Sequence, residues 1–243
     1  MLKAGLVGLG IDYSKSKEYF NRFHPDIDYT ILDTEYLALA IGDFLRNGYI
    51  GFNVTTPYKR YIKKYLDDCL GDYINCVKIT KRGKLIGIST VGMAIEKILS
   101  RYKIITNHEK CLESVAILGN GGVVPAILDV IKKYTKDITI YARQAKDVLP
   151  YTLYHQVNLD WFDPYAHELI INCIPFSANV KLDILRSQSL CAGRIFHFSY
   201  FDLNYAGDQL SLELAKSNKN CINAINGLEM LYEQAELSYK FWL

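Results

Sequence analysis

The segment SVAILGNGGVVPAILDVI, residues 114–131, decides the fold. It joins an apolar run, a glycine-rich turn and a second apolar run. This order predicts a buried strand, a tight turn and a helix, as in dinucleotide-binding folds, where the helix N-terminus receives a phosphate. Val124 stands where the third glycine of G-x-G-x-x-G is usual, so a glycine turn without a ligand is the alternative. The residues expected to contact a cofactor are Gly119, Asn120, Gly121, Gly122 and Val123.

The next expected strand, DITIYAR (residues 137–143), indicates which cofactor this turn would accept. It ends in Arg143, and Lys146 follows nearby. NAD-binding folds carry a carboxylate at this strand end for the ribose 2′-hydroxyl, whereas a cation suits the 2′-phosphate of NADP. We therefore predict NADP as the cofactor, with a solvated arginine on a loop as the alternative.

Strands and helices alternate along the rest of the chain, which predicts an α/β fold with parallel sheets covered by helices. The polar stretch near residues 103–112 is the candidate domain boundary. The expected strands are 3–9, 28–34, 49–55, 74–80, 83–90, 114–120, 137–143, 168–175 and 194–200, with 74–80 and 83–90 forming a hairpin. The expected helices are 15–23, 35–48, 58–70, 91–102 and 121–135.

Composition excludes several classes of protein. The chain has 243 residues and a net charge of +2, so nothing indicates a nucleic-acid partner, and no apolar run reaches the length of a membrane span. The cysteines form no C-x-x-C pair and the five histidines are scattered, which argues against a metal site and a disulfide framework and favours a cytoplasmic protein. The cysteines are Cys69, Cys76, Cys111, Cys173, Cys191 and Cys221.

A second informative segment, GFNVTTPYK (residues 51–59), places an amide, two hydroxyls and an ammonium at an expected strand end. A helix cap at Thr56 ahead of Pro57, with an exposed lysine, would explain the hydroxyls. It would not explain Asn53 and Lys59 together with the distant serines Ser14 and Ser16.

The whole chain resembles the shikimate dehydrogenase family. GFNVTTPYK is similar to the family's Asn-Val-Thr-x-Pro-x-Lys signature, and GLVGLGIDYSKSKEYFNRF to its N-terminal strand and Ser-x-Ser turn. INCVKI, GKLIGISTVG, LGNGGV, LIINCIP and NGLEMLYEQAELSYKFW resemble further family segments in the same order. We align HFSY, residues 197–200, with the family's Asp-Met-x-Tyr segment.

This resemblance implies a function and a set of site residues. The family reduces 3-dehydroshikimate to shikimate with NADPH, in chorismate and aromatic amino-acid biosynthesis. Lys59 matches the catalytic lysine, and Gly227 would lie beside the nicotinamide. The substrate-binding residues would be Ser14, Ser16, Thr55, Asn75, Tyr200 and Gln234.

The family architecture implies a substrate domain of residues 1–100, completed by the closing helix 227–243. A Rossmann-like NADP-binding domain of residues 101–226 would lie between these segments. We expect a small cyclic hydroxy acid as the substrate, no membrane partner, and a monomer or homodimer.

One departure from the family pattern affects the chemistry. The family's Asn-Thr-Asp is Ser89, Thr90 and Val91 here, so the aspartate that pairs with the lysine is replaced by valine. Three interpretations follow: a dehydrogenase of the shikimate type, a ligand-binding protein with little or no turnover on the same fold, or altered chemistry on a related acid. For the third, Asp12, Tyr13 and His197 are candidate replacements.

Overall fold

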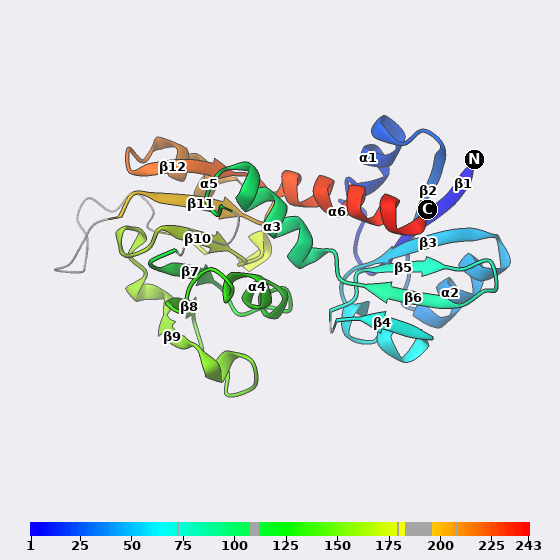
Figure 1. The fold of residues 1–243 in the computed structure, drawn as a ribbon, viewed down its shortest axis with the longest axis horizontal. Coiled ribbons are helices and arrows are strands. Elements are labelled where there is room, and N and C mark those ends of the chain that lie inside the picture. The colour runs from blue at the N-terminus through cyan, green and yellow to red at the C-terminus, as the bar shows by residue number, and fades with distance from the viewer. Residues whose placement is uncertain (72, 107–111, 179, 183–195, 208) are drawn as a thin grey trace. The chain divides into compact units, whose positions relative to one another are not determined.

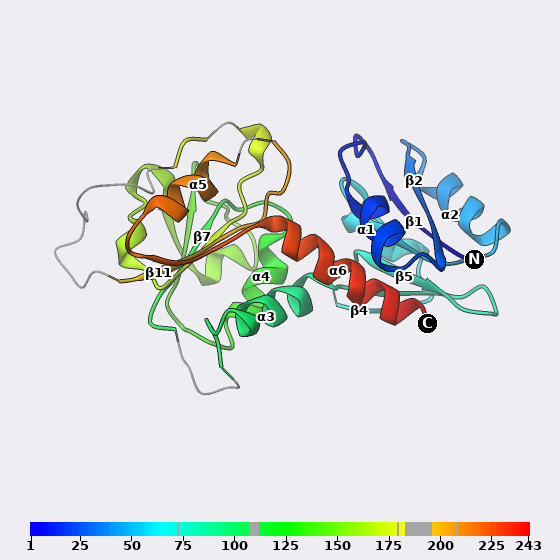
Figure 2. The same cartoon turned by 90° about the horizontal axis from the view of Figure 1, so that it is seen from above.

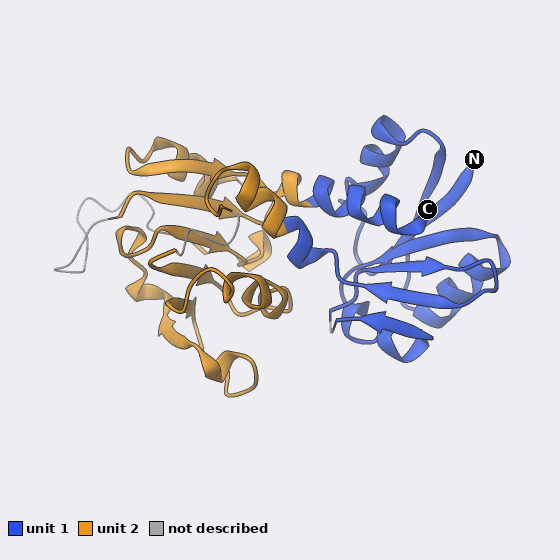
Figure 3. Ribbon diagram, in the orientation of Figure 1, with its two compact units in different colours: residues 1–94, 231–243 blue, residues 95–230 orange. Residues whose placement is uncertain are grey.

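The computed structural model describes residues 1–71, 73–106, 112–178, 180–182, 196–207 and 209–243. The chain divides into two compact units, residues 1–94 with 231–243 and residues 95–230 (Figure 3). Both boundaries fall within helices, one in α3 (Val91–Arg101) and the other in α6 (Gly227–Trp242).

The first unit is built on a mixed six-stranded sheet of order β2-β1-β3-β5-β6-β4 (Figure 1). β1 pairs in parallel with β2 and β3, β5 pairs antiparallel with β3 and β6, and β4 pairs in parallel with β6. The hairpin predicted between β5 and β6 is confirmed. The strands are Leu2–Gly8 (β1), Ile27–Asp33 (β2), Tyr49–Val54 (β3), Asp68–Leu70 (β4), Cys76–Ile79 (β5) and Leu85–Ile88 (β6).

Side chains on the two faces of this sheet join two separate cores, because successive residues of a strand point to opposite faces. On one face, Val7 and Phe52 pack against α2 (Leu37–Arg46). On the other face, Ala4 and Leu6 pack with α1 (Ser16–Phe23) and with the part of α6 that belongs to this unit. The packing of α6 fixes Trp242, whose Nε1 donates to the Val77 carbonyl oxygen at 3.0 Å.

The helix predicted over residues 58–70 is wrong. This segment forms two 3₁₀ helices, Tyr58–Arg60 (η1) and Ile62–Tyr65 (η2), and then β4. Tyr58 and Ile62 are buried with a spacing of four, which imitates a helical face in the sequence. Leu66 is extended, with φ −92° and ψ 140°, because the chain must turn to pair β4 with β6. Pairing between distant segments therefore overrides the local pattern.

The second unit contains a parallel six-stranded sheet of order β12-β11-β10-β7-β8-β9. From β7 the chain runs outward through β8 and β9, and later through β10, β11 and β12 on the other side, which is the Rossmann-like order. α5 (Leu210–Ser217) and α4 (Val124–Ile131) cover opposite faces of the sheet (Figure 2). The predicted α/β class with a doubly wound sheet is confirmed. The strands are Val115–Leu118 (β7), Ile138–Ala142 (β8), His155–Asn158 (β9), Leu169–Asn172 (β10), Phe198–Asp202 (β11) and Cys221–Ile225 (β12).

Sequence patterns did not reveal β9, β12 and α5. β9 and β12 lie at the edges of the sheet and carry polar residues, so neither shows the apolar run of a central strand. β11 ends at Asp202 rather than at residue 200, and residues 194 and 195 of the expected strand lie outside the described residues. Residues 107–111 of the predicted boundary at 103–112 also lie outside them. No helix in the described ranges is long and apolar enough to cross a membrane.

Candidate functional site

A buried hydrogen-bond cluster centred on Asn75 lies in the first unit. The Asn75 Nδ2 donates to Thr90 Oγ1 at 2.8 Å and to Gln234 Oε1 at 3.0 Å, and Thr90 N donates to Asn75 Oδ1 at 2.7 Å. Both donors of the Asn75 amide are therefore used within the protein. Among the described residues, the Gln234 Nε2 group has no partner, so Asn75 orients Gln234 with its donor group available.

Ser14 and Ser16 lie at the start of α1, where a short turn brings their hydroxyls to 3.2 Å. The preceding loop is held by the carboxylate of Asp33, at the end of β2, which accepts from the backbone N–H groups of Gly10 at 2.9 Å and Ile11 at 2.7 Å. The loop after the neighbouring strand β1 is thereby fixed, and the two serines keep a defined position. Their side chains are half-buried and buried, respectively.

Thr55 follows β3 directly, and its N–H donates to the Val7 carbonyl oxygen at 3.0 Å. Its own carbonyl accepts from Tyr58 N at 2.8 Å, which begins the short 3₁₀ helix that carries Lys59. Thr55 and Lys59 are both half-buried. The sequence GFNVTTPYK therefore places its hydroxyl and its ammonium on one turn at the end of a central strand.

Lys59 has no hydrogen bond or ion pair within the described part of the chain. Burial lowers the pKa of Lys59 below the ordinary lysine value, and no carboxylate of the described residues opposes this shift. A lowered pKa increases the fraction of neutral amine near pH 7, and this is the form that accepts a proton.

Val91 occupies the first position of α3 and is 3% exposed. Two residues earlier, the Ser89 Oγ is buried and has no hydrogen-bond partner among the described residues. Thr90, which is bonded to Asn75, therefore has the unpaired hydroxyl of Ser89 before it and the apolar side chain of Val91 after it.

In the second unit, the glycine turn connects β7 to α4 with Pro125 in the first turn of the helix. Gly119 has φ +93°, which favours glycine, and a Cβ there would lie 3.1 Å from the Ile174 side chain. Gly121 has no atom within 4 Å of the position of a Cβ. The turn is thus tightly packed at its first glycine and open at Gly121, as a phosphate-binding turn requires.

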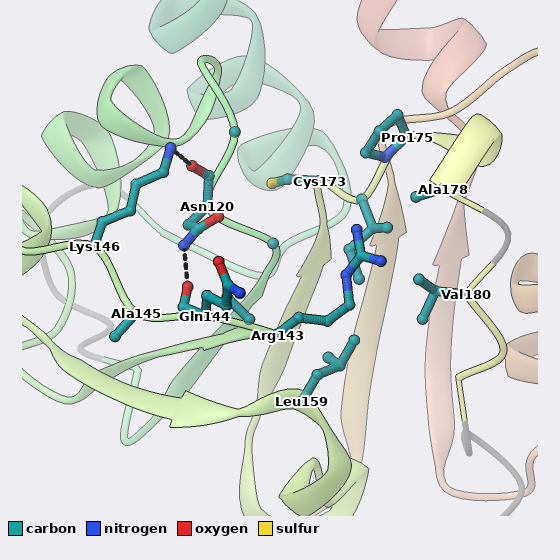
Figure 4. Close-up of a pocket in the computed structure, with 14 residues that line it drawn as sticks. Asn120, Arg143, Gln144, Ala145, Lys146, Leu159, Cys173, Pro175, Ala178 and Val180 are labelled. Atoms are coloured by element: carbon teal, nitrogen blue, oxygen red, sulfur yellow. Dashed lines mark hydrogen bonds between the residues drawn. The ribbon is translucent and has the colours of Figure 1, made fainter.

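A pocket of about 520 Å³ lies beside this turn. β7 and β10 are neighbours at the centre of the sheet, and the chain continues from them to opposite sides, to β8 and to β11. Binding at this switch point is usual in open α/β sheets. Arg143 extends across the pocket towards Val180, and its guanidinium has no partner among the described residues (Figure 4). Lys146 instead donates from its ammonium to the Asn120 carbonyl oxygen at 2.5 Å (Figure 4). Arg143 is therefore the free cation of the described pocket wall.

The structure groups the predicted site residues into two sets. Six of them belong to the first unit, and these are Ser14, Ser16, Thr55, Lys59, Asn75 and Gln234. The others belong to the second unit, and these are Gly119, Asn120, Gly121, Gly122, Val123, Arg143, Tyr200 and Gly227.

Comparison with known proteins identifies the family, although no protein-family model matches the chain. The NADP(+) shikimate dehydrogenase of Clostridium botulinum (strain Loch Maree / Type A3) is 30% identical over 268 residues, covering 100% of this chain and 96% of that protein. The chain belongs to the shikimate dehydrogenase family.

Solved shikimate dehydrogenase structures agree with this assignment. A chorismate mutase/shikimate 5-dehydrogenase fusion protein from Clostridium acetobutylicum has a TM-score of 0.78 at 25% identity and covers 100% of this chain and 91% of that chain. A shikimate dehydrogenase solved in complex with NADP⁺ has a TM-score of 0.78 at 26% identity and covers 100% of this chain and 90% of that chain.

Within this shikimate dehydrogenase fold, Tyr200 belongs to the interior of the second unit. Its side chain is 0% exposed in the middle of β11, and its hydroxyl donates to Asp202 Oδ2 at 3.4 Å. It is therefore core, and not the wall of an open pocket. The segment Asp202-Leu203-Asn204-Tyr205 has the spacing of the family's Asp-Met-x-Tyr, begins at a real aspartate, and starts where β11 ends. Counting from that aspartate would have selected Tyr205, which is half-buried.

Gly227 begins α6, and a Cβ there would collide with the Leu203 carbonyl group. Its N–H donates to the Asn204 carbonyl oxygen at 3.3 Å. The Asn204 side chain is in turn bonded to Asp202 Oδ1 at 2.8 Å and to the Ile174 carbonyl at 2.9 Å. The close approach explains the glycine, and the network joins the loops that follow β10 and β11.

Proposed function

We propose that this protein is an NADP-dependent oxidoreductase that interconverts 3-dehydroshikimate, or a closely related cyclic acid, and shikimate. The single observation that supports this best is the group of unpaired polar side chains in the first unit. Among the described residues, Lys59 Nζ and Gln234 Nε2 lack partners, although both residues are half-buried. A polyhydroxylated ligand would satisfy such groups, which otherwise cost stability.

The second unit fits NADP. Gly119, Asn120 and Gly121 would lie against the pyrophosphate, and Gly227 near the nicotinamide. The unpaired guanidinium of Arg143 would meet the 2′-phosphate, since planar Arg pairs well with phosphate. Bound NADP supplies the hydride chemistry.

For the substrate, we assign the carboxylate to the hydroxyls of Ser14 and Ser16, which lie 3.2 Å apart on a fixed turn. Thr55 and Gln234 would bind ring hydroxyls. Asn75 would act mainly by orienting Gln234 and Thr90, because both its donors are already occupied. We propose Tyr205 in place of the buried Tyr200.

Lys59 would carry the proton transfer. As a neutral amine it would accept the proton of the reacting hydroxyl during oxidation, and as an ammonium it would stabilise the oxygen during reduction. Its lowered pKa favours the first role near neutral pH.

A second function, ligand binding with little turnover, is favoured by one observation. The family's aspartate is Val91 here, so the partner that would orient the ammonium is missing from that position. Steady-state NADP⁺ reduction with shikimate and with quinate, together with calorimetric binding of both acids, separates the two functions. Turnover of either acid supports the dehydrogenase, and binding without turnover supports the alternative. If neither acid is bound or turned over, both functions are refuted.

A further inference from the structure

The segment that follows β8 folds back onto the glycine turn and bonds to its peptide groups. The Lys146 ammonium donates to the Asn120 carbonyl oxygen at 2.5 Å, and the Tyr151 hydroxyl donates to the Gly121 carbonyl oxygen at 2.8 Å. Neither bond involves a side chain of the turn. The Asn120 side chain adds a further bond between the two segments, from its Nδ2 to the Gln144 carbonyl oxygen at 2.7 Å (Figure 4).

The backbone of both donor residues, Lys146 and Tyr151, is held by Gln156 in the edge strand β9. Its Oε1 accepts from Lys146 N at 2.8 Å, and its Nε2 donates to the Lys146 carbonyl at 3.0 Å and to the Tyr151 carbonyl at 3.2 Å. The Lys146 ammonium also lies 4.9 Å from the centre of the Tyr151 ring, and Tyr151 is 4% exposed. We call Lys146, Tyr151 and Gln156 the loop brace.

The loop brace determines where the N–H groups of the turn point. A trans peptide is planar with its N–H opposite its carbonyl, so fixing the Asn120 carbonyl fixes the Gly121 N–H in the opposite direction. Fixing the Gly121 carbonyl fixes the Gly122 N–H in the same manner. Gly121 is exposed and has no side chain to anchor it, so these bonds supply the order that packing does not.

We propose that Tyr151 and Lys146 are positioning residues, which preset the glycine turn for the pyrophosphate of a dinucleotide through their bonds to the carbonyl groups of the turn. The proposal rests on the proposed NADP site. Preordering of this kind improves affinity because the ordering cost is met before the ligand binds. It also commits the Lys146 ammonium to the turn, which leaves the 2′-phosphate to Arg143.

The test uses Tyr151→Phe in the full chain, with Tyr154→Phe as the matched control. Tyr154 is close in sequence and half-buried, and its hydroxyl has no hydrogen bond among the described residues. Binding is measured by NADPH fluorescence titration and by displacement of NADPH with adenosine 2′-monophosphate, which has the 2′-phosphate and no pyrophosphate.

We expect Tyr151→Phe to weaken NADPH binding about three- to tenfold, the usual effect of one hydrogen bond, and to leave adenosine 2′-monophosphate unchanged. Hydrogen exchange of the amides in residues 119–123 should become faster in this variant only. If Tyr151→Phe does not fold, Lys146→Met is measured in its place, with the exchange rates and NADPH affinity expected to change in the same direction.

Three outcomes overturn the proposal. Equal NADPH affinity in the wild type and Tyr151→Phe refutes the loop brace alone, since the cofactor site is then intact. If Tyr151→Phe weakens the binding of NADPH and of adenosine 2′-monophosphate equally, Tyr151 supports the whole unit and does not act through the turn. A wild-type protein that does not bind NADPH refutes the proposed function, and the loop brace has no role in binding.

Discussion

Replacing Val91 by aspartate tests whether one residue separates this chain from its dehydrogenase relatives. Val91 is the first residue of α3 and is 3% exposed, with a buried unpaired hydroxyl at Ser89 two residues earlier. In the family pattern this position holds the aspartate that pairs with the lysine, here Lys59. Val91→Asp would therefore restore a carboxylate at a helix N-terminus.

Two opposing effects set the magnitude. Burying an unpaired carboxylate costs several kcal/mol, whereas a helix N-terminus returns about 0.3–1 kcal/mol, and up to about 2 kcal/mol when partly buried. We expect the free protein to lose about 1–3 kcal/mol of unfolding free energy. With ligand bound, pairing with Lys59 and a substrate hydroxyl offsets this loss, and shikimate oxidation should rise at least about tenfold, or about 1.4 kcal/mol.

The assay is steady-state NADP⁺ reduction with shikimate, alongside thermal unfolding and NADPH binding. Val91→Asn is the matched control, since it has the same shape without the charge and should gain much less activity. A Val91→Asp protein that folds, binds NADPH and gains no activity would show that the site has changed beyond this residue. Ordinary turnover by the unmodified protein would show that the aspartate is dispensable.

Three further variants test other parts of the structure. Lys59→Met should abolish turnover and raise the melting temperature by a few degrees, because it removes a desolvated ammonium; normal turnover in steady-state assays would exclude Lys59 from catalysis. Arg143→Ala should raise the KM for NADP and hardly change that for NAD, and equal effects on both would argue against a 2′-phosphate contact. His167 lies between Ser114 Oγ at 2.8 Å and Tyr141 OH at 2.9 Å, and burial lowers its pKa to about 4. The unfolded chain binds the extra proton near pH 6.5, so urea titrations should show about 3 kcal/mol of stability lost as pH falls from about 6.5 to about 4, and a His167→Gln variant with the same loss would contradict this.

The sequence predicts the fold well where local and long-range requirements agree. The apolar run of β7, its glycine turn and α4 all satisfy the same parallel βα unit, so residues 114–131 are enough to predict it. Residues 58–70 show the opposite case. Their helical spacing of buried side chains is real, yet β4 needs the same residues for pairing with β6. A one-dimensional pattern does not contain that partner.

The candidate site divides in the same way. Residues on turns that match the family pattern, such as Ser14, Lys59 and Gly119, each lie near the end of a helix or strand, where a polar side chain or a glycine has a clear chemical use. The alignment of HFSY places Tyr200 inside a strand, where the alternation of side chains between the two faces decides which way each one points, and Tyr200 points into the core. The loop brace was not predictable, because its bonds reach backbone carbonyls and carry no residue signature at positions 120 and 121.

The balance of donors in the first unit favours a ligand over a purely structural role for its polar cluster. Both donors of the Asn75 amide bond to protein groups, and one of these groups is the Gln234 Oε1 atom. The Gln234 amide nitrogen is left without a partner within the described residues. Lys59 is unpaired as well, and its lowered pKa reflects the cost of burial without a counter-charge. A cluster that served only the fold would be more stable with apolar groups or with its donors paired internally. The unpaired donors therefore represent stability that a hydroxylated acid can recover on binding, whether or not Val91 permits fast turnover.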